Sequence, residues 1–316
     1  MAIARAVAIA GHRQGTMDTT REQRLLKLSI TVTLAVGAVG IASGLLVRSQ
    51  AIVFEGMYSL VDVVLTVASL AVSRLVQREG SHRFQYGYWH LEPLVEAFGG
   101  AILALACIYA AVNAVDGLLT GGHEVSYGFG AAWAAVLCVV GLVMAAMMRR
   151  HARALESGLL ALDARSWLVS GLLSLALLVG FAFAVALEGT AYASWVPYVD
   201  SAVLLAIAVT MLPVPLLATW SAMREVLQVA PDELDRLVQS VMDAVVAERG
   251  FLDYTSHVAK MGRARFVEIH ILVPPDYVIG SIANADAIRR EIAERMGAHG
   301  PQFWLTVDFT ADRAWT

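Results

Sequence analysis

Residues 51–73 read AIVFEGMYSLVDVVLTVASLAVS and are apolar throughout, except for two acids at positions 55 and 62. A helix of this length can cross the hydrocarbon core of a bilayer, which takes about 20 residues. Asp62 lies 11 residues past Ala51, about 16 Å along the helix axis, and so is predicted near the middle of the membrane. A carboxylate at that depth costs about 2.5–3.5 kcal/mol and normally faces a partner or a water-filled path.

Five more apolar runs of similar length follow the same pattern along the chain. Strands of a transmembrane barrel would be about half as long and would alternate in polarity, which these runs do not. We therefore predict a membrane-embedded, all-α bundle of six helices. Besides Ala51–Ser73, the predicted spans are Leu28–Val47, Ala97–Val115, Val125–Met148, Ser166–Leu187 and Ser201–Met223.

The composition separates a membrane part from a soluble tail. Of the 316 residues 58% are hydrophobic and 16% are charged, whereas soluble domains carry roughly 25% charged residues. Of the 50 charged side chains, 24 lie in the last 93 residues. With a net charge of −4 the chain has no signature of nucleic-acid binding. We predict an N-terminal segment at 1–26, a six-helix domain at 27–223 and a tail domain at 224–316.

The short loops predict the orientation, because Lys and Arg are retained on the cytoplasmic side. Segments 120–128 and 188–195 contain neither residue. The N-terminal segment and the loops after the second and fourth spans are rich in basic residues, nearly all of them Arg, so both termini are expected in the cytoplasm of a multi-pass protein of the inner or plasma membrane. These basic residues are Arg5, Arg13, Arg21, Arg24, Lys27, Arg74, Arg78, Arg83, Arg149, Arg150, Arg153 and Arg165.

The tail has the pattern of a small α+β domain in the order α-β-β-α-β. Val267, Ile269, Ile271 and Val273 alternate with polar residues, as in a strand with one buried face. About 90 residues can fold alone only marginally, so a homodimer is expected. The predicted elements are a helix from Asp232, its cap, to Glu248, strands at Tyr254–Lys260, Arg265–Val273 and Phe303–Phe309, and a second helix at Asn284–Met296.

The ionisable residues inside the spans are the candidate functional residues. Asp62 on the second span and Asp163 near the start of the fifth could share a divalent cation, or one could take up a proton. Glu55 lies on the same helical face as Asp62. Local pairing is the alternative, with Arg165 or a backbone group for Asp163 and headgroup-level water for Glu55. Two further acids, Asp116 and Asp200, fall at span ends, and we expect both to be solvated.

These features resemble the cation diffusion facilitator family of divalent-metal/proton antiporters. The resemblance runs from about Lys27 to Phe309 and includes the mid-membrane sequence YSLVD at 58–62. Segment 84–93 (FQYGYWHLEP) is similar to the family's aromatic, Gly- and His-containing loop before the third span. In the family, the second and fifth spans each present two ligands one turn apart, commonly Asp-x-x-x-Asp and His-x-x-x-Asp. The fold implied for the tail is ferredoxin-like.

The resemblance implies Tyr58, Asp62 and Asp163 as metal ligands, with Asp163 in the usual His place. Trp167 stands in the usual Asp place and offers a metal no lone pair, and Tyr88 stands where a His is usual. Glu55 is a candidate fourth donor. An all-oxygen set suits harder ions such as Mn²⁺ or Fe²⁺ better than Zn²⁺.

The resemblance also implies a regulatory metal site in the tail, where family members bind metal at a dimer interface. By order along the chain, His257, His270 and Asp308 match those positions.

The function implied is export of a divalent metal cation (Zn, Co, Cd, Mn or Fe) from the cytoplasm in exchange for protons, with Asp62 and Asp163 at the transport site. No enzymatic activity is expected. Two other interpretations stay open. Trp167 motivates a transport-inactive relative that acts as a dimeric metal sensor or scaffold. Two intramembrane acids could also form an aspartyl protease dyad, although no Gly-x-Gly-Asp motif surrounds either of them.

Overall fold

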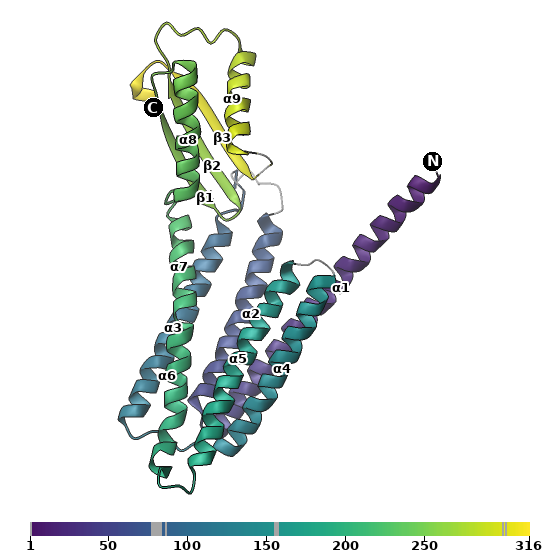
Figure 1. The fold of residues 1–316 in the computed structure, drawn as a ribbon, viewed down its shortest axis with the longest axis vertical. Helices are drawn as coiled ribbons and strands as arrows, with labels where there is room; N and C mark the ends of the chain where they lie inside the picture. The colour runs from purple at the N-terminus through teal and green to yellow at the C-terminus, as the bar shows by residue number, and fades with distance from the viewer. Residues whose placement is uncertain (1, 77–83, 86, 155–157, 299, 301) are drawn as a thin grey trace. The chain divides into compact units, whose positions relative to one another are not determined.

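The computed structural model describes residues 2–76, 84–85, 87–154, 158–298, 300 and 302–316. The described ranges do not include two of the basic loop residues, Arg78 and Arg83, or Tyr86 of the aromatic loop. Within the described ranges, six helical segments are long and apolar enough to cross a membrane, which confirms the six predicted spans. The first five are α1 (Ala2–Val47), α2 (Gln50–Val76), α3 (Leu91–Leu119), α4 (Tyr127–Ala154) and α5 (Gly158–Leu187), and the sixth joins η1 (Ala193–Tyr198), α6 (Val199–Met211) and α7 (Pro213–Val226) (Figure 1).

Two prolines divide the sixth span. Pro213 and Pro215 have no backbone N–H, so neither can donate the bond that an α-helix would make four residues back. The amides on either side keep their bonds, from Leu212 to the Ala208 carbonyl at 3.0 Å and from Leu216 to the Leu212 carbonyl at 3.2 Å. The span therefore continues past residue 212 as two helices that meet at Pro213.

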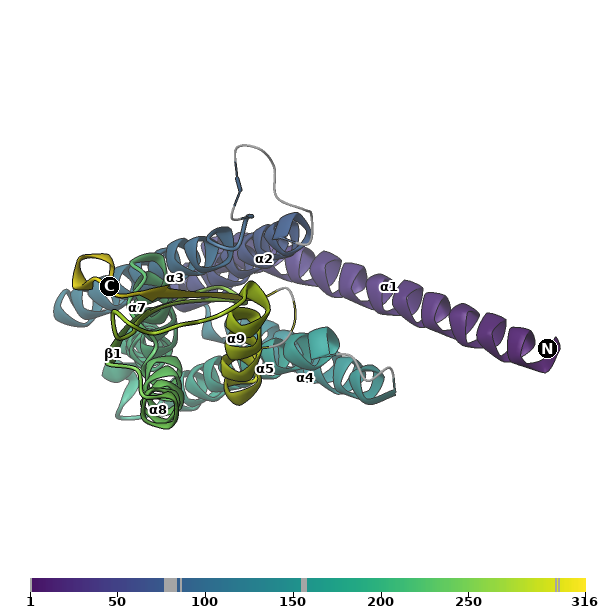
Figure 2. The same cartoon turned by 90° about the horizontal axis from the view of Figure 1, so that it is seen from above.

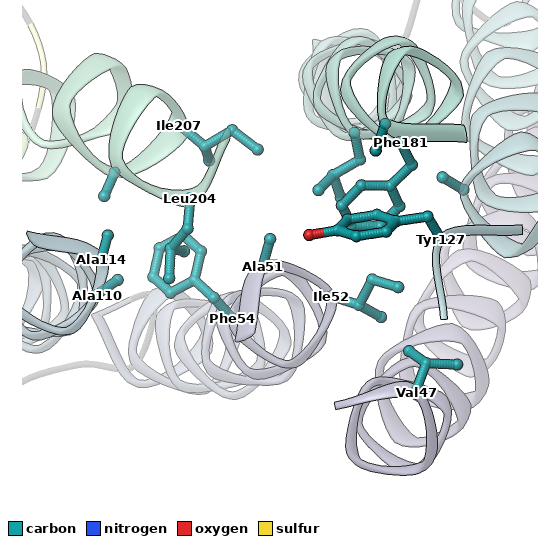
Figure 3. Packing of buried hydrophobic residues seen from close by; sticks show 14 of the residues in the cluster. Val47, Ala51, Ile52, Phe54, Ala110, Ala114, Tyr127, Phe181, Leu204 and Ile207 are labelled. Atoms are coloured by element: carbon teal, nitrogen blue, oxygen red, sulfur yellow. The ribbon is translucent and has the colours of Figure 1, made fainter. Parts of the chain in front are cut away.

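The chain forms two compact units, of which the first comprises residues 1–67 and 101–216. Its main core lies between α2, α3, α4, α5 and α6, and Figure 3 shows Ile52, Tyr127 and Phe181 close together in it. The rings of Tyr127 and Phe181 meet edge to face, with centroids 5.6 Å apart. The Tyr127 hydroxyl donates to the Val196 carbonyl at 2.8 Å, which satisfies its polar end in this apolar setting.

Glycines allow the spans of the first unit to approach each other closely. A Cβ on Gly141 of α4 would lie 2.7 Å from the Cα of Gly171 on α5, and a Cβ on Gly44 of α1 would lie 2.7 Å from the backbone nitrogen of Val53 on α2. No larger residue fits at either place without separating the helices. Backbone approach at small residues is a common way for helices to associate in membranes, where dispersion contacts dominate.

Asp200 corrects one expectation. We expected a solvated end at this position, but Asp200 is fully buried in the first unit. Its carboxylate accepts hydrogen bonds from the Ser49 hydroxyl at 2.6 Å and from the Gln50 amide at 2.9 Å. It therefore caps the N-terminus of α2 from the start of α6, where free N–H groups and the helix dipole favour an anion. Asp116 is exposed, as expected.

The second unit comprises residues 68–100 and 217–316 and contains the tail domain. The predicted order α-β-β-α-β is confirmed. Its three strands lie in the order β1-β2-β3, with β1 and β2 antiparallel and β2 and β3 parallel, so the sheet is mixed. The elements are α8 (Asp232–Arg249), β1 (Asp253–Met261), β2 (Ala264–Leu272), α9 (Ile282–Met296), β3 (Phe303–Thr310) and η2 (Arg313–Trp315).

Both tail helices cover the same face of this sheet (Figure 2). The alternating residues Val267, Ile269 and Ile271 of β2 are completely buried under them, together with Ile292 of α9. The opposite face of the sheet therefore carries the polar residues of the alternation. This is the face on which the predicted tail ligands lie.

The first tail helix begins differently from the prediction. Asp232 is its first helical residue rather than its cap, since Pro231 takes the capping position and no side chain caps the N-terminus. Asp232 still lies where the helix dipole favours an acid. Gly250 ends the helix with φ 70°, a left-handed conformation that glycine adopts without a Cβ clash.

The β1–β2 turn contacts helix ends within the second unit. Glu225 of α7 accepts from the Lys260 ammonium at 2.7 Å and from the Gly262 amide at 3.1 Å. Glu92, in the first turn of α3, pairs with Arg263 at 3.3 Å. Two carboxylates, both in the second unit, therefore link this turn to the first turn of α3 and the last turn of α7.

Candidate functional site

Asp62 and Tyr58 lie one turn apart on α2, as the sequence predicts. Both side chains are half-buried, and they are close enough to interact electrostatically. The Tyr58 ring packs against Phe54, with ring centroids 5.9 Å apart. None of the described residues donates a hydrogen bond to the Asp62 carboxylate, so its oxygens stay available to another ligand.

Asp163 contacts α1 rather than a neighbour on its own helix. Its Oδ1 accepts a hydrogen bond from the Ser29 hydroxyl at 2.9 Å, and Ser29 accepts one from the Trp167 indole N–H at 2.7 Å. Arg165, the local partner considered above, is exposed. The second oxygen, Oδ2, is buried and has no partner among the described residues.

The two predicted acids lie on different helices of the first unit. Asp62 and Asp163 come from different spans and lie within electrostatic range, so their charges repel when both are ionised. A doubly charged cation between them would neutralise both charges. No cluster of three His, Cys, Asp or Glu side chains with metal-binding geometry occurs in the part of the chain that the structure describes. The arrangement thus supplies two carboxylates, with the Tyr58 phenol beside Asp62.

Glu55 lies two turns from Asp62 and has a different environment. Its Oε1 accepts from the Ser174 hydroxyl of α5 at 2.5 Å, while its buried Oε2 has no partner among the described residues. It borders a cavity of about 10 Å³, room for about one water molecule. Glu55 is thus held by α5. The cavity lies between α1, α2, α4 and α5 and is lined by Val36, Gly40, Glu55, Gly56, Ser59, Leu137, Trp167, Ser170 and Ser174.

The predicted tail residues share one face of the sheet. His270 lies opposite Asp308 in the parallel β2–β3 register, with His270 Nδ1 3.8 Å from Asp308 Oδ2. The rings of His257 and His270 have centroids 6.3 Å apart. Glu268 lies directly across from His257, a neighbour that the sequence argument missed. These groups lie on one face of the sheet. Among the described residues of one chain, however, they do not form a cluster of three side chains with metal-binding geometry.

Sequence reasoning also missed the two serines that hold the intramembrane acids. Ser29 of α1 and Ser174 of α5 are 2% and 1% exposed, the burial expected of groups in a specific polar contact. Other hydroxyl residues stand near each of them, Thr31 and Thr33 near Ser29 and Ser170 near Ser174, so the sequence does not single out the two serines. Their partners lie 134 and 119 residues away, so no local pattern reveals the pairing.

Comparison with known proteins agrees with these features. The family profile described as the cation efflux transmembrane domain matches residues 26–227. The chain is 24% identical over 252 residues to the metal cation efflux system protein CzcD of Cupriavidus metallidurans, and equally to the cation efflux system protein CzcD of Alcaligenes sp. strain CT14. Each alignment covers 79% of this chain and 76% of the relative.

The profile match extends from residue 26, within the first span, past the end of the sixth, and includes the spans that carry Asp62 and Asp163. Together with the six apolar helices and the α+β tail, this match identifies a multi-pass membrane transporter. The chain belongs to the cation diffusion facilitator family of cation efflux transporters.

Proposed function

We propose that this protein exports a divalent metal cation in exchange for protons, and that Asp62 and Asp163 bind the cation. The observation that carries the proposal is the buried Oδ2 of Asp163, which lacks a partner among the described residues and lies on a carboxylate within electrostatic range of Asp62. A buried charge is stable only when it is paired. A divalent cation supplies that pairing for both acids, with Tyr58 as a third oxygen donor.

The same oxygens explain how protons would drive release. A carboxylate ligand must be deprotonated to bind a metal, so protons and the metal compete for Asp62 and Asp163. With the site open to the cytoplasm, both ionised acids take up the cation. With the site open to the outside, protons entering down their gradient displace it. The basic loops support an orientation in which both termini lie in the cytoplasm and protons enter from the outside.

The tail would join two copies of the chain and respond to cytoplasmic metal. His257, His270 and Asp308 lie on one face of the sheet, and a second copy could complete their coordination. Metal bound there shifts the transporter between its two states only if it binds one state more tightly. We expect isothermal titration of the full-length protein carrying His270→Ala to lose one class of Zn²⁺ sites. An unchanged number of sites would contradict the tail site.

Flux through reconstituted protein tests the proposed function. Proteoliposomes with an imposed pH gradient are expected to move at least one of Zn²⁺, Co²⁺, Cd²⁺, Mn²⁺ or Fe²⁺, and the flux should fall when an ionophore collapses the gradient. Protein-free liposomes are the control. If none of these ions moves but the protein still binds metal through its tail, the chain is a sensor or scaffold and the transport proposal is wrong.

A further inference from the structure

A chain of two hydrogen bonds runs from Trp167 through Ser29 to Asp163. The indole N–H donates to the Ser29 hydroxyl oxygen at 2.7 Å, and the hydroxyl donates to Asp163 Oδ1 at 2.9 Å. Trp167 is 5% exposed and Ser29 is 2% exposed, so water does not compete for either bond. The chain links α1 to two positions of α5 that are one helical turn apart.

The chemistry of these groups fixes the direction of both bonds. An indole N–H can only donate, so the Ser29 oxygen must accept from Trp167. A hydroxyl has a single hydrogen, and that hydrogen then goes to Asp163. Oδ1 of Asp163 is therefore held as an acceptor, and Oδ2 is its remaining oxygen for another ligand.

We propose that Trp167 and Ser29 are positioning residues that orient Asp163 so that it presents one oxygen, Oδ2, to the transported cation. This inference rests on the proposed function, in which Asp163 is a ligand. Trp167 cannot coordinate a metal itself. It acts through Ser29, whose hydroxyl it orients toward the carboxylate. Hydrogen-bond partners of metal ligands typically change metal affinity 10–100-fold when they are removed.

A packing role for Trp167 must be separated from this positioning role. Trp167 also lies in an apolar cluster with Met148 of α4 and Leu160 of α5. Trp167→Phe keeps an aromatic ring in that cluster and removes only the N–H donor and part of the volume. Ser29→Ala removes the link to Asp163, and Ser29→Thr keeps a hydroxyl. Ser43→Ala is the matched control, because Ser43 is a buried serine of the same helix.

The test is equilibrium binding of Mn²⁺, Fe²⁺, Co²⁺, Zn²⁺ and Cd²⁺ to the purified full-length protein in nanodiscs. Ser29→Ala is expected to weaken the binding that depends on Asp163 about 10–100-fold. Ser29→Thr should restore most of it, and Ser43→Ala should leave it unchanged. Trp167→Phe should weaken binding in the wild-type background but not in the Ser29→Ala background, because Trp167 acts through Ser29. Loss of packing alone would give additive effects and no rescue by threonine.

Two outcomes distinguish this inference from the proposed function. If Asp163→Ala binds each of the five ions as tightly as the wild type does, or if neither protein binds any of them, the proposed function is wrong. This inference is then wrong as well. If Asp163→Ala abolishes a binding site that Ser29→Ala and Trp167→Phe leave intact, only the positioning role is wrong. Additive effects of the two variants would overturn it as well.

Discussion

Asp62→Asn is expected to abolish metal efflux while leaving the protein folded. Asparagine keeps the shape of the side chain but removes one of the two charges proposed to neutralise the cation. Removing one partner of a buried charge pair costs about 3–5 kcal/mol, and each 1.4 kcal/mol is a factor of ten in affinity. Metal affinity should therefore fall about 100-fold or more. The measurement is pH-driven flux in proteoliposomes, together with equilibrium metal binding.

Asp116→Asn is the matched control for this variant. Asp116 is also an acid of a membrane-spanning helix, but it is exposed near the end of α3. Its replacement removes the same charge at an exposed position and should leave flux within about twofold of wild type, as surface substitutions usually do. Flux at the wild-type rate in Asp62→Asn would show that this carboxylate does not bind the cargo.

Asp200→Ala is expected to cause the largest loss of stability. The Asp200 carboxylate is fully buried and accepts from the Ser49 hydroxyl and the Gln50 backbone amide, so alanine leaves a buried and a partly buried donor without this acceptor. Each such donor costs about 1–3 kcal/mol, which gives a total of about 3 kcal/mol. Thermal unfolding of the purified protein, followed by tryptophan fluorescence, should show a clearly lower midpoint.

The unfolding midpoint of Asp200→Asn should lie between those of Asp200→Ala and the wild type, because the asparagine side chain keeps an acceptor oxygen for one of the two donors. Asp116→Ala is the control. Its free energy of unfolding is expected to change by less than about 0.5 kcal/mol, because the Asp116 side chain is exposed. An unchanged midpoint in Asp200→Ala would mean that this carboxylate does not hold the start of α2.

The sequence predicts the spans and the tail because both follow from local patterns. Each span is a continuous apolar run, since every backbone group must be bonded within its own helix in the absence of water. The strands of the tail alternate because one face of the sheet is buried, as Val267, Ile269 and Ile271 demonstrate. These patterns require no knowledge of which elements are neighbours.

The contacts of the acids could not be predicted in this way, because they depend on helix packing. Asp163 is bonded to Ser29, 134 residues away, and Asp200 to Ser49, 151 residues away. The position of Asp200 in the sequence, at the start of the sixth predicted span, predicts a solvated side chain. Its burial results from the free amides of α2, an attraction that appears only once α2 and α6 are adjacent. The proposed ligand roles of Tyr58, Asp62 and Asp163 stay predictions.

The proline pair in the sixth span has a mechanical consequence. In an unbroken helix, bending opens hydrogen bonds that no solvent replaces inside a bilayer. Pro213 and Pro215 carry no backbone N–H to donate, so bending at the junction of α6 and α7 breaks fewer backbone hydrogen bonds than bending elsewhere in the span. The start of α6 is held through Asp200, which accepts from the Ser49 hydroxyl, and the last turn of α7 carries Glu225, which accepts from Lys260. The junction of α6 and α7 is therefore the place where the sixth span resists bending least.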